Sequence, residues 1–172
     1  GIGTASLGAN TTGASNTAIG YQALDTNSTG SRNTAVGNEA LDDSTTGDDN
    51  TAVGYFALLS ATTASRNTSV GALCNYGQTT GDDNTAVGYS ALGSVNSGSD
   101  NVVVGGYAMD ANTTGGDNTA VGKSALGANT TGGYNTAVGR EALLQSTTSS
   151  QNVAVGRNAL RGTNTNGYNT AV

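Results

Sequence analysis

The chain has no proline, no histidine and no tryptophan, and it has only one cysteine and one phenylalanine. Without histidine, and with Cys74 alone, the sequence offers no nucleophile–base pair and no acid–base constellation, so we expect no enzyme and no intrachain disulfide. Charged residues make up 10% of the chain and give a net charge of −6, which disfavours nucleic acid as a partner. No apolar run approaches the ~20 residues of a membrane span, so we expect no direct membrane insertion by this segment.

What the sequence does contain is one repeat of 17 residues, built on Asn-Thr-Ala-Val-Gly, which runs without insertion or deletion. Such a strict short period indicates stacked units that bury their apolar faces only against each other. We therefore predict an all-β fold, a parallel β-solenoid of ten coils forming a single repeat domain over residues 1–172. Because the chain starts and stops inside a repeat, we expect a segment of a longer repetitive fibre protein.

We number the repeat from its Asn as position 1. Amides stacked at strand spacing bond to one another and to turn backbone, so we predict a structural ladder of buried amides. The position 1 residues that define this ladder include Asn16, Asn33, Asn50, Asn84, Asn118 and Asn135.

Position 4 is always Val or Ile, and a β-branched residue in a strand is predicted to fill the coil interior. Because adjacent strand residues face opposite ways, the small residue at position 3 is then expected to face outward, against another chain. Position 5 is always Gly, which indicates a positive φ or no room for a Cβ atom. Representative members of the two ladders are Val36, Val53, Val87, Val121 and Val138, and Gly20, Gly37, Gly54, Gly88 and Gly122.

Positions 8 and 9 are usually Ala-Leu, as in Ala23-Leu24, which predicts a second buried stripe on a second short strand. A polar Thr-Thr-Gly return closes each coil. The unit from Asn67 departs from the pattern with Leu73-Cys74-Asn75, so we expect local irregularity over residues 74–77 and a buried Cys74.

Position 17 carries Arg32, Asp49, Arg66, Asp83, Asp100 and Asp117 in consecutive units. The alternating part predicts a ladder of cross-coil ion pairs. For Asp83, Asp100 and Asp117 the favoured interpretation is solvated repulsion, and a bridging Ca²⁺ ion is the alternative. No other metal or cofactor is expected.

The Asn-Thr-Ala-Val-Gly core, followed by a small-residue turn and Ala-Leu, resembles the head repeats of trimeric autotransporter adhesins of the YadA type. It is also similar to β-roll repeats of bacteriophage tail fibres. The resemblance implies a left-handed parallel β-roll and a side-by-side homotrimer whose interior and interface are lined by the Val, Ala and Gly ladders. The departure is in length, because the adhesin coils are shorter.

These features predict a structural and adhesive rod of an extracellular, cell-surface fibre, with itself as a trimeric partner and an unidentified surface receptor or matrix. The first alternative is the shaft of a phage or phage-like tail fibre on a virion. An ice-binding β-solenoid is the second alternative, because the Thr columns at positions 13 and 14 repeat regularly. The exposed aromatic residues that we consider first for recognition are Tyr21, Tyr55, Phe56, Tyr89 and Tyr107.

Overall fold

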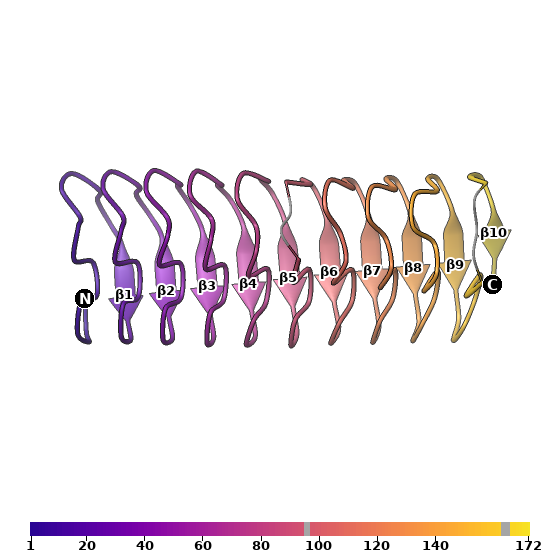
Figure 1. The fold of residues 1–172 in the computed structure, drawn as a ribbon, viewed down its shortest axis with the longest axis horizontal. Helices are drawn as coiled ribbons and strands as arrows, with labels where there is room; N and C mark the ends of the chain where they lie inside the picture. Colours follow the sequence, from indigo (N-terminus) through magenta and orange to yellow (C-terminus); the bar gives the residue numbers. More distant parts are fainter. Residues whose placement is uncertain (95–96, 163–165) are drawn as a thin grey trace.

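The computed structural model describes residues 1–94, 97–162 and 166–172. The coils stack along one axis into a rod, with the N terminus at one end and the C terminus at the other (Figure 1). The described residues contain strands and turns and no helix, which confirms the all-β prediction.

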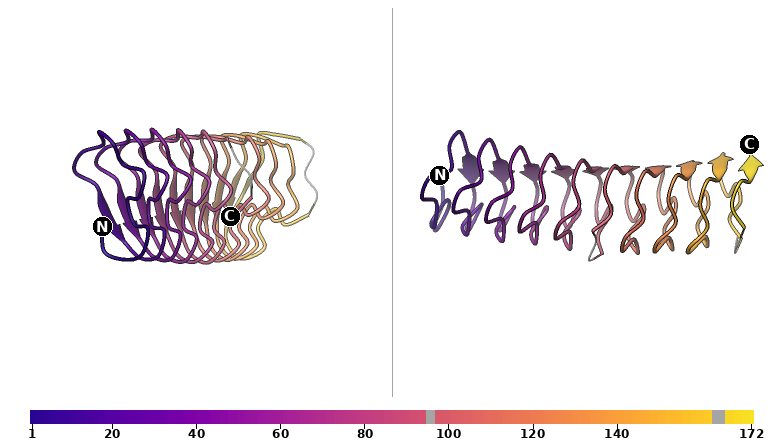
Figure 2. Two further views of the ribbon diagram at one scale, coloured as in Figure 1. Left: turned by 60° about the vertical axis from the view of Figure 1, so that its left-hand side comes forward. Right: turned by 90° about the horizontal axis from the view of Figure 1, so that it is seen from above.

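Each repeat contributes one short strand to a single parallel sheet in which the strands follow their order in the chain. The register advances by one repeat per strand, so Ala35 lies opposite both Ala18 and Ala52. The strands therefore form one gently curved row along the rod (Figure 2), and the predicted parallel β-solenoid is confirmed. The strands are β1 (Thr17–Ile19), β2 (Thr34–Val36), β3 (Thr51–Val53), β4 (Thr68–Val70), β5 (Thr85–Val87), β6 (Val102–Val104), β7 (Thr119–Val121), β8 (Thr136–Val138), β9 (Val153–Val155) and β10 (Thr170–Ala171).

The strands bury position 3, not position 4. Ala35 and Ala52 are fully buried, whereas Ile19 is 40% exposed and Val87 is 37% exposed. The prediction that Val and Ile point into the coil was therefore wrong, and so was the expectation that Ala faces outward. The reason is the period of two along a strand: the Asn at position 1 lies inside the coil, so position 3 shares its side and positions 2 and 4 face out.

After each strand the chain curls through a turn, and the described part of the repeats forms no second strand. The residues at positions 7 and 9 have positive φ, as in Gln22 at 51° and Leu24 at 55°. This left-handed conformation costs about 1–2 kcal/mol per non-Gly residue. It nevertheless brings the consecutive residues Ala23 and Leu24 into the core together, both fully buried, which a strand with alternating faces does not allow. The second strand was wrongly predicted, although the second buried stripe is present.

The turns also join neighbouring coils through backbone hydrogen bonds. The N–H of Leu24 donates to the carbonyl of Ala40, and the N–H of Gln22 donates to the carbonyl of Thr4, both at 3.0 Å. Gly54 at position 5 has a φ of 138°, and a Cβ atom there would lie 2.5 Å from the carbonyl oxygen of Gly71. Both reasons for an obligatory Gly therefore hold at this position.

The coil that begins at Asn67 (residues 67–83, the Asn67 coil) keeps the backbone path of the others. Leu73 has a φ of 56° and Asn75 a φ of 51°, as at the same positions elsewhere. The irregularity expected over residues 74–77 is therefore one of side chains and not of backbone handedness.

Polar side chains interrupt the apolar core in the Asn67 coil. Ser69 takes the place of Ala at position 3, and Asn75 takes the place of Leu at position 9, and both are fully buried. The core is consequently divided into two clusters, one that ends at Ala64 and one that starts at Cys74.

Candidate binding surfaces

The outer side of the sheet is one continuous surface, which we call the Thr–Val face. Its Val and Ile side chains are half-exposed to exposed, and among the described residues its Thr hydroxyls have no hydrogen-bond partner. A stripe of methyl groups and free hydroxyls this long and regular is typical of an interaction surface. The face is made of Thr17, Ile19, Thr34, Val36, Thr51, Val53, Thr68, Val70, Thr85, Val87, Val102, Val104, Thr119, Val121, Thr136, Val138, Val153 and Val155.

The Asn ladder lies inside the coils and bonds to backbone. The Nδ2 of Asn33 donates to the carbonyl of Gly47 at 2.7 Å, and its Oδ1 accepts the N–H of Asn50 at 2.9 Å. Asn84, Asn118 and Asn135 repeat this arrangement and are buried, while Asn16 is half-buried. Because these amides bond to the protein itself, they offer no site for a ligand.

The Thr columns at positions 13 and 14 lie along the return of each coil. The Oγ1 of Thr45 donates to the carbonyl of Thr62 at 2.9 Å, and that of Thr113 donates to Thr130 at 2.9 Å. The hydroxyls at position 13 are thus used to join coils. The Thr hydroxyls of the Thr–Val face and the exposed Thr hydroxyls at position 14 form no hydrogen bond among the described residues.

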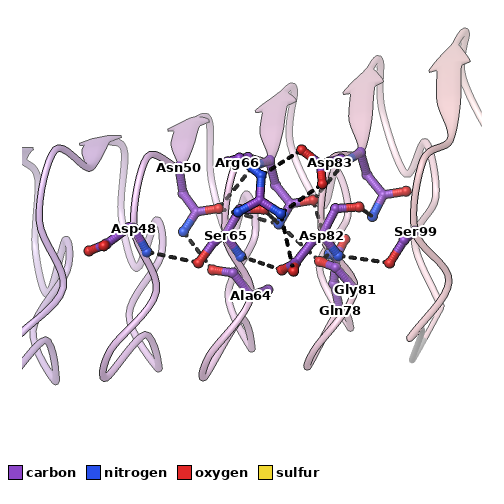
Figure 3. Close-up of polar contacts among 12 residues, drawn as sticks. Asp48, Asn50, Ala64, Ser65, Arg66, Gln78, Gly81, Asp82, Asp83 and Ser99 are labelled. Atoms are coloured by element: carbon purple, nitrogen blue, oxygen red, sulfur yellow. Dashed lines mark hydrogen bonds and ion pairs between the residues drawn. The ribbon is translucent and has the colours of Figure 1, made fainter.

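Arginine and aspartate at position 17 pair between coils. Arg66 Nε contacts Asp83 Oδ1 at 2.7 Å, and its guanidinium also reaches Asp82 at 3.4 Å (Figure 3). Arg32 pairs in the same way with Asp49, at 2.6 Å. The hydrogen bond from Arg66 holds the pKa of Asp83 below its ordinary value, and the hydrogen bond from Arg32 does the same for Asp49.

The aspartates proposed as a Ca²⁺ ligand set are not brought together. Over the described residues, no group of three or more acidic, histidine or cysteine side chains is placed to hold a metal ion. The carboxylate of Asp83 is bound to Arg66, while Asp100 and Asp117 lie exposed on the following coils. The geometry therefore gives no support to the calcium interpretation.

A second acidic group lies near the N-terminal end of the rod. Burial raises the pKa of Asp42 to about 6, and the nearby carboxylates of Asp43, Asp25 and Glu39 add to the effect. The charged form of Asp42 is therefore less favourable in the folded chain than in water.

The candidate aromatic residues lie in the turns that follow the strands. The rings of Tyr55 and Phe56 stack with centroids 4.0 Å apart, and those of Tyr89 and Tyr107 meet edge-on at 5.3 Å. Tyr21 is 50% exposed, without a ring contact among the described residues. The first four thus lie in pairs, and the structure also exposes Tyr134 and Tyr168, which the sequence analysis did not single out.

One groove lies beside Tyr107, with a volume of about 590 Å³. Of its lining residues, only Tyr107 belongs to the recognition residues predicted from the sequence. The available signal was Gly127, where neighbouring repeats carry a side chain. The groove is lined by Tyr107, Asp110, Ala111, Ser124, Gly127, Ala128, Leu144 and Gln145.

Two other features limit the chemistry of the described part. Cys74 is buried, and burial raises the pKa of its thiol to about 12, so the reactive thiolate is not formed at neutral pH. Asn27, Asn67, Asn112 and Asn129, which each begin an Asn-x-Ser/Thr sequence, are fully buried. Within the residues that the structure describes, no helix has the length and apolar character needed to cross a membrane.

Comparison with known proteins found no match, whether among family models, curated proteins or solved structures.

Proposed function

We propose that the chain is a shaft segment of an extracellular fibre, in which three copies associate side by side through their Thr–Val faces. The observation that carries the proposal is that face, which leaves a regular apolar column exposed along the whole sheet. Burial of apolar area drives association, and identical strands repeated at one spacing supply the same contacts many times. Because the Ala column is buried inside the coils, we place the proposed interface on the Val and Thr columns instead.

The fibre serves as a structural and adhesive rod that holds or presents binding sites for a surface receptor or matrix. The repeat pattern resembles adhesin heads on bacterial cells, and a phage or phage-like tail-fibre shaft of the same architecture is the alternative. Repetition supports either role, because many weak sites on one rigid rod bind tightly through avidity.

The mass of the particle in solution tests self-association. Light scattering coupled to size exclusion is expected to give three times the chain mass of 16.8 kDa. A variant with Val53→Lys, Val87→Lys and Val121→Lys places three charges on the Thr–Val face and is expected to be monomeric. A control with Thr63→Lys and Thr131→Lys, on the exposed return, should keep the parent mass. A stable monomer of the parent chain would overturn the proposal.

Ice binding is the second candidate, and a specific observation moves it to another surface. The Thr hydroxyls of the Thr–Val face are free and lie on the regular sheet, whereas the Thr hydroxyls at position 13 of the return donate to the next coil and leave only position 14 free there. If the parent chain is monomeric and slows ice recrystallisation, and Thr51→Lys with Thr85→Lys abolishes the effect, this candidate replaces the fibre. An inactive parent chain excludes it.

A further inference from the structure

The groove beside Tyr107 lies on a diagonal between two neighbouring coils. Position 7 of one coil faces position 10 of the next, as the pairing of Glu141 with Arg161 at 2.9 Å shows. On the equivalent diagonal two coils earlier, position 7 is Tyr107 and position 10 is Gly127. Since glycine has no side chain to close the contact, the space beside the Tyr107 ring stays open.

The floor and walls of the groove are defined by the side chains around Gly127. A Cβ atom added to Gly127 would lie 3.0 Å from Leu144 Cδ1 and 3.6 Å from Asp110 Oδ1. Leu144 and Asp110 therefore border the same space, together with the Ser124 hydroxyl and the Gln145 amide. A volume of about 590 Å³ with mainly apolar walls and a few polar groups is typical of a site for a small ligand.

The groove contains a carboxylate without a cationic partner. Burial raises the pKa of Asp110, and among the described residues no lysine or arginine forms an ion pair with it. This is so although residues 118–172 carry four basic side chains and only one acidic one. On the equivalent diagonal the fold itself pairs the carboxylate of Glu141 with the guanidinium of Arg161. The charge of the groove is therefore complementary to a cation, which the face of the Tyr107 ring also attracts.

We propose that this groove binds a protonated amino sugar, such as a glucosamine unit of a surface polysaccharide. The ammonium group pairs with Asp110, the apolar side of the sugar ring packs against Tyr107 and Leu144, and the hydroxyls bond to Ser124 and Gln145. A neutral sugar lacks the charge for Asp110, and an acidic sugar is repelled by it. This site is separate from self-association, because it lies in the turns after the strands and not on the Thr–Val face.

Titration of the isotope-labelled full chain, followed by amide chemical shifts at pH 6.5, tests the ligand class. Methyl glucosaminide is expected to bind with a millimolar Kd and to shift amides around Gly127. Methyl N-acetylglucosaminide and methyl glucoside, which keep the ring and lose the charge, should bind at least tenfold more weakly. Choline, which keeps a charge and loses the ring, should also bind at least fivefold more weakly. Equal binding of the neutral sugars, or of choline, would overturn the proposal.

Two variants test the location of the site. Asp110→Asn removes the charge at nearly constant shape, and Gly127→Leu fills the groove with the side chain that Leu59 and Leu144 place at the same position of their coils. Each should weaken methyl glucosaminide binding at least tenfold, while Tyr55→Ala, in a distant turn, should leave it unchanged. Thermal melting checks that each variant is folded. If Gly127→Leu does not fold, the affinity of Asp110→Asn alone tests the site. Unchanged affinity in Asp110→Asn would refute the site even if the chain proves to be a trimer.

Discussion

The coil at residues 50–66 (the Asn50 coil) and the Asn67 coil that follows it share a backbone but not a core. Both have the Asn ladder, the Gly at position 5 and left-handed residues at positions 7 and 9. The Asn50 coil buries Ala52 and Leu58, whereas the Asn67 coil buries Ser69 and Asn75 in their places. The path of the chain is therefore set by the hydrogen-bonded ladder and the Gly, and the apolar core adds stability to a path already determined.

The difference carries a free-energy cost in the Asn67 coil. The Oγ of Ser69 and both polar atoms of the Asn75 amide are buried without a partner among the described residues. Each buried polar group without a partner costs about 1–3 kcal/mol of stability. The Asn67 coil should accordingly be the weakest interior coil of the described rod, and four substitutions test this.

The largest effect is expected when the Asn50 coil receives the position 9 residue of the Asn67 coil. Leu58→Asn removes a fully buried apolar side chain and introduces an amide, and should lower the free energy of unfolding by about 4 kcal/mol. Chemical denaturation measures it. A loss below about 1 kcal/mol would mean that Leu58 contributes little and that the two coils do not differ in stability.

The reverse substitution should stabilise the chain. Asn75→Leu restores the apolar residue and removes the partnerless amide, and the left-handed backbone at this position offsets part of the gain. We expect a net increase of about 2 kcal/mol in the free energy of unfolding. Tyr76→Leu, at an exposed neighbouring position, is the control and should give no comparable gain.

A smaller gain is expected at position 3. Ser69→Ala removes a buried hydroxyl without a partner and restores the residue of the other coils, which should add about 0.5–1 kcal/mol. Ser65→Ala is the informative contrast, because the Oγ of Ser65 accepts the N–H of Asp48 at 3.1 Å. Loss of stability in both variants would show that the hydroxyl of Ser69 does have a partner.

The smallest effect concerns the ion pair that joins the two coils. Arg66 lowers the pKa of Asp83, so this contribution to stability is present above the unfolded pKa and is lost as the pH falls through the lower folded pKa. Arg66→Gln should lower the melting temperature slightly at pH 7 and low salt. The difference should disappear near pH 2 and in 1 M salt. A difference that survives both conditions would indicate packing of the Arg66 side chain and not charge.

The strict period was sufficient to predict the solenoid, its parallel register and the buried stripe of Ala23 and Leu24. It was not sufficient to predict which side chains of the strand point into the coil. The β preference of Val36 suggested that Val36 does, whereas Asn33 and Ala35, which are two residues apart, lie on the same side of the strand. The buried Asn was the better guide, because an amide that bonds to turn backbone has to lie inside the coil. The two-residue spacing of Asn33 and Ala35 is therefore the sequence signal for the buried side of the strand.

The turns and the groove were beyond sequence reasoning for different reasons. Leu24 adopts a left-handed conformation that isolated propensity disfavours, and its burial and its hydrogen bond to Ala40 of the next coil compensate for it. The groove depends on the absence of a side chain at Gly127 between two coils that have one, which becomes visible only when coils are compared across the diagonal. Among the proposed recognition residues, Tyr107 alone lines it.

The contact of each strand with only its two neighbours determines how the rod responds to tension. A force applied to the two ends along the axis is carried by every coil in series. A coil that gives way releases 17 residues, which is ~60 Å of extended chain, in place of a rise of ~4.8 Å in the stack. The rod therefore lengthens in equal increments under load, and the first interior increment comes from the coil that holds Ser69 and Asn75.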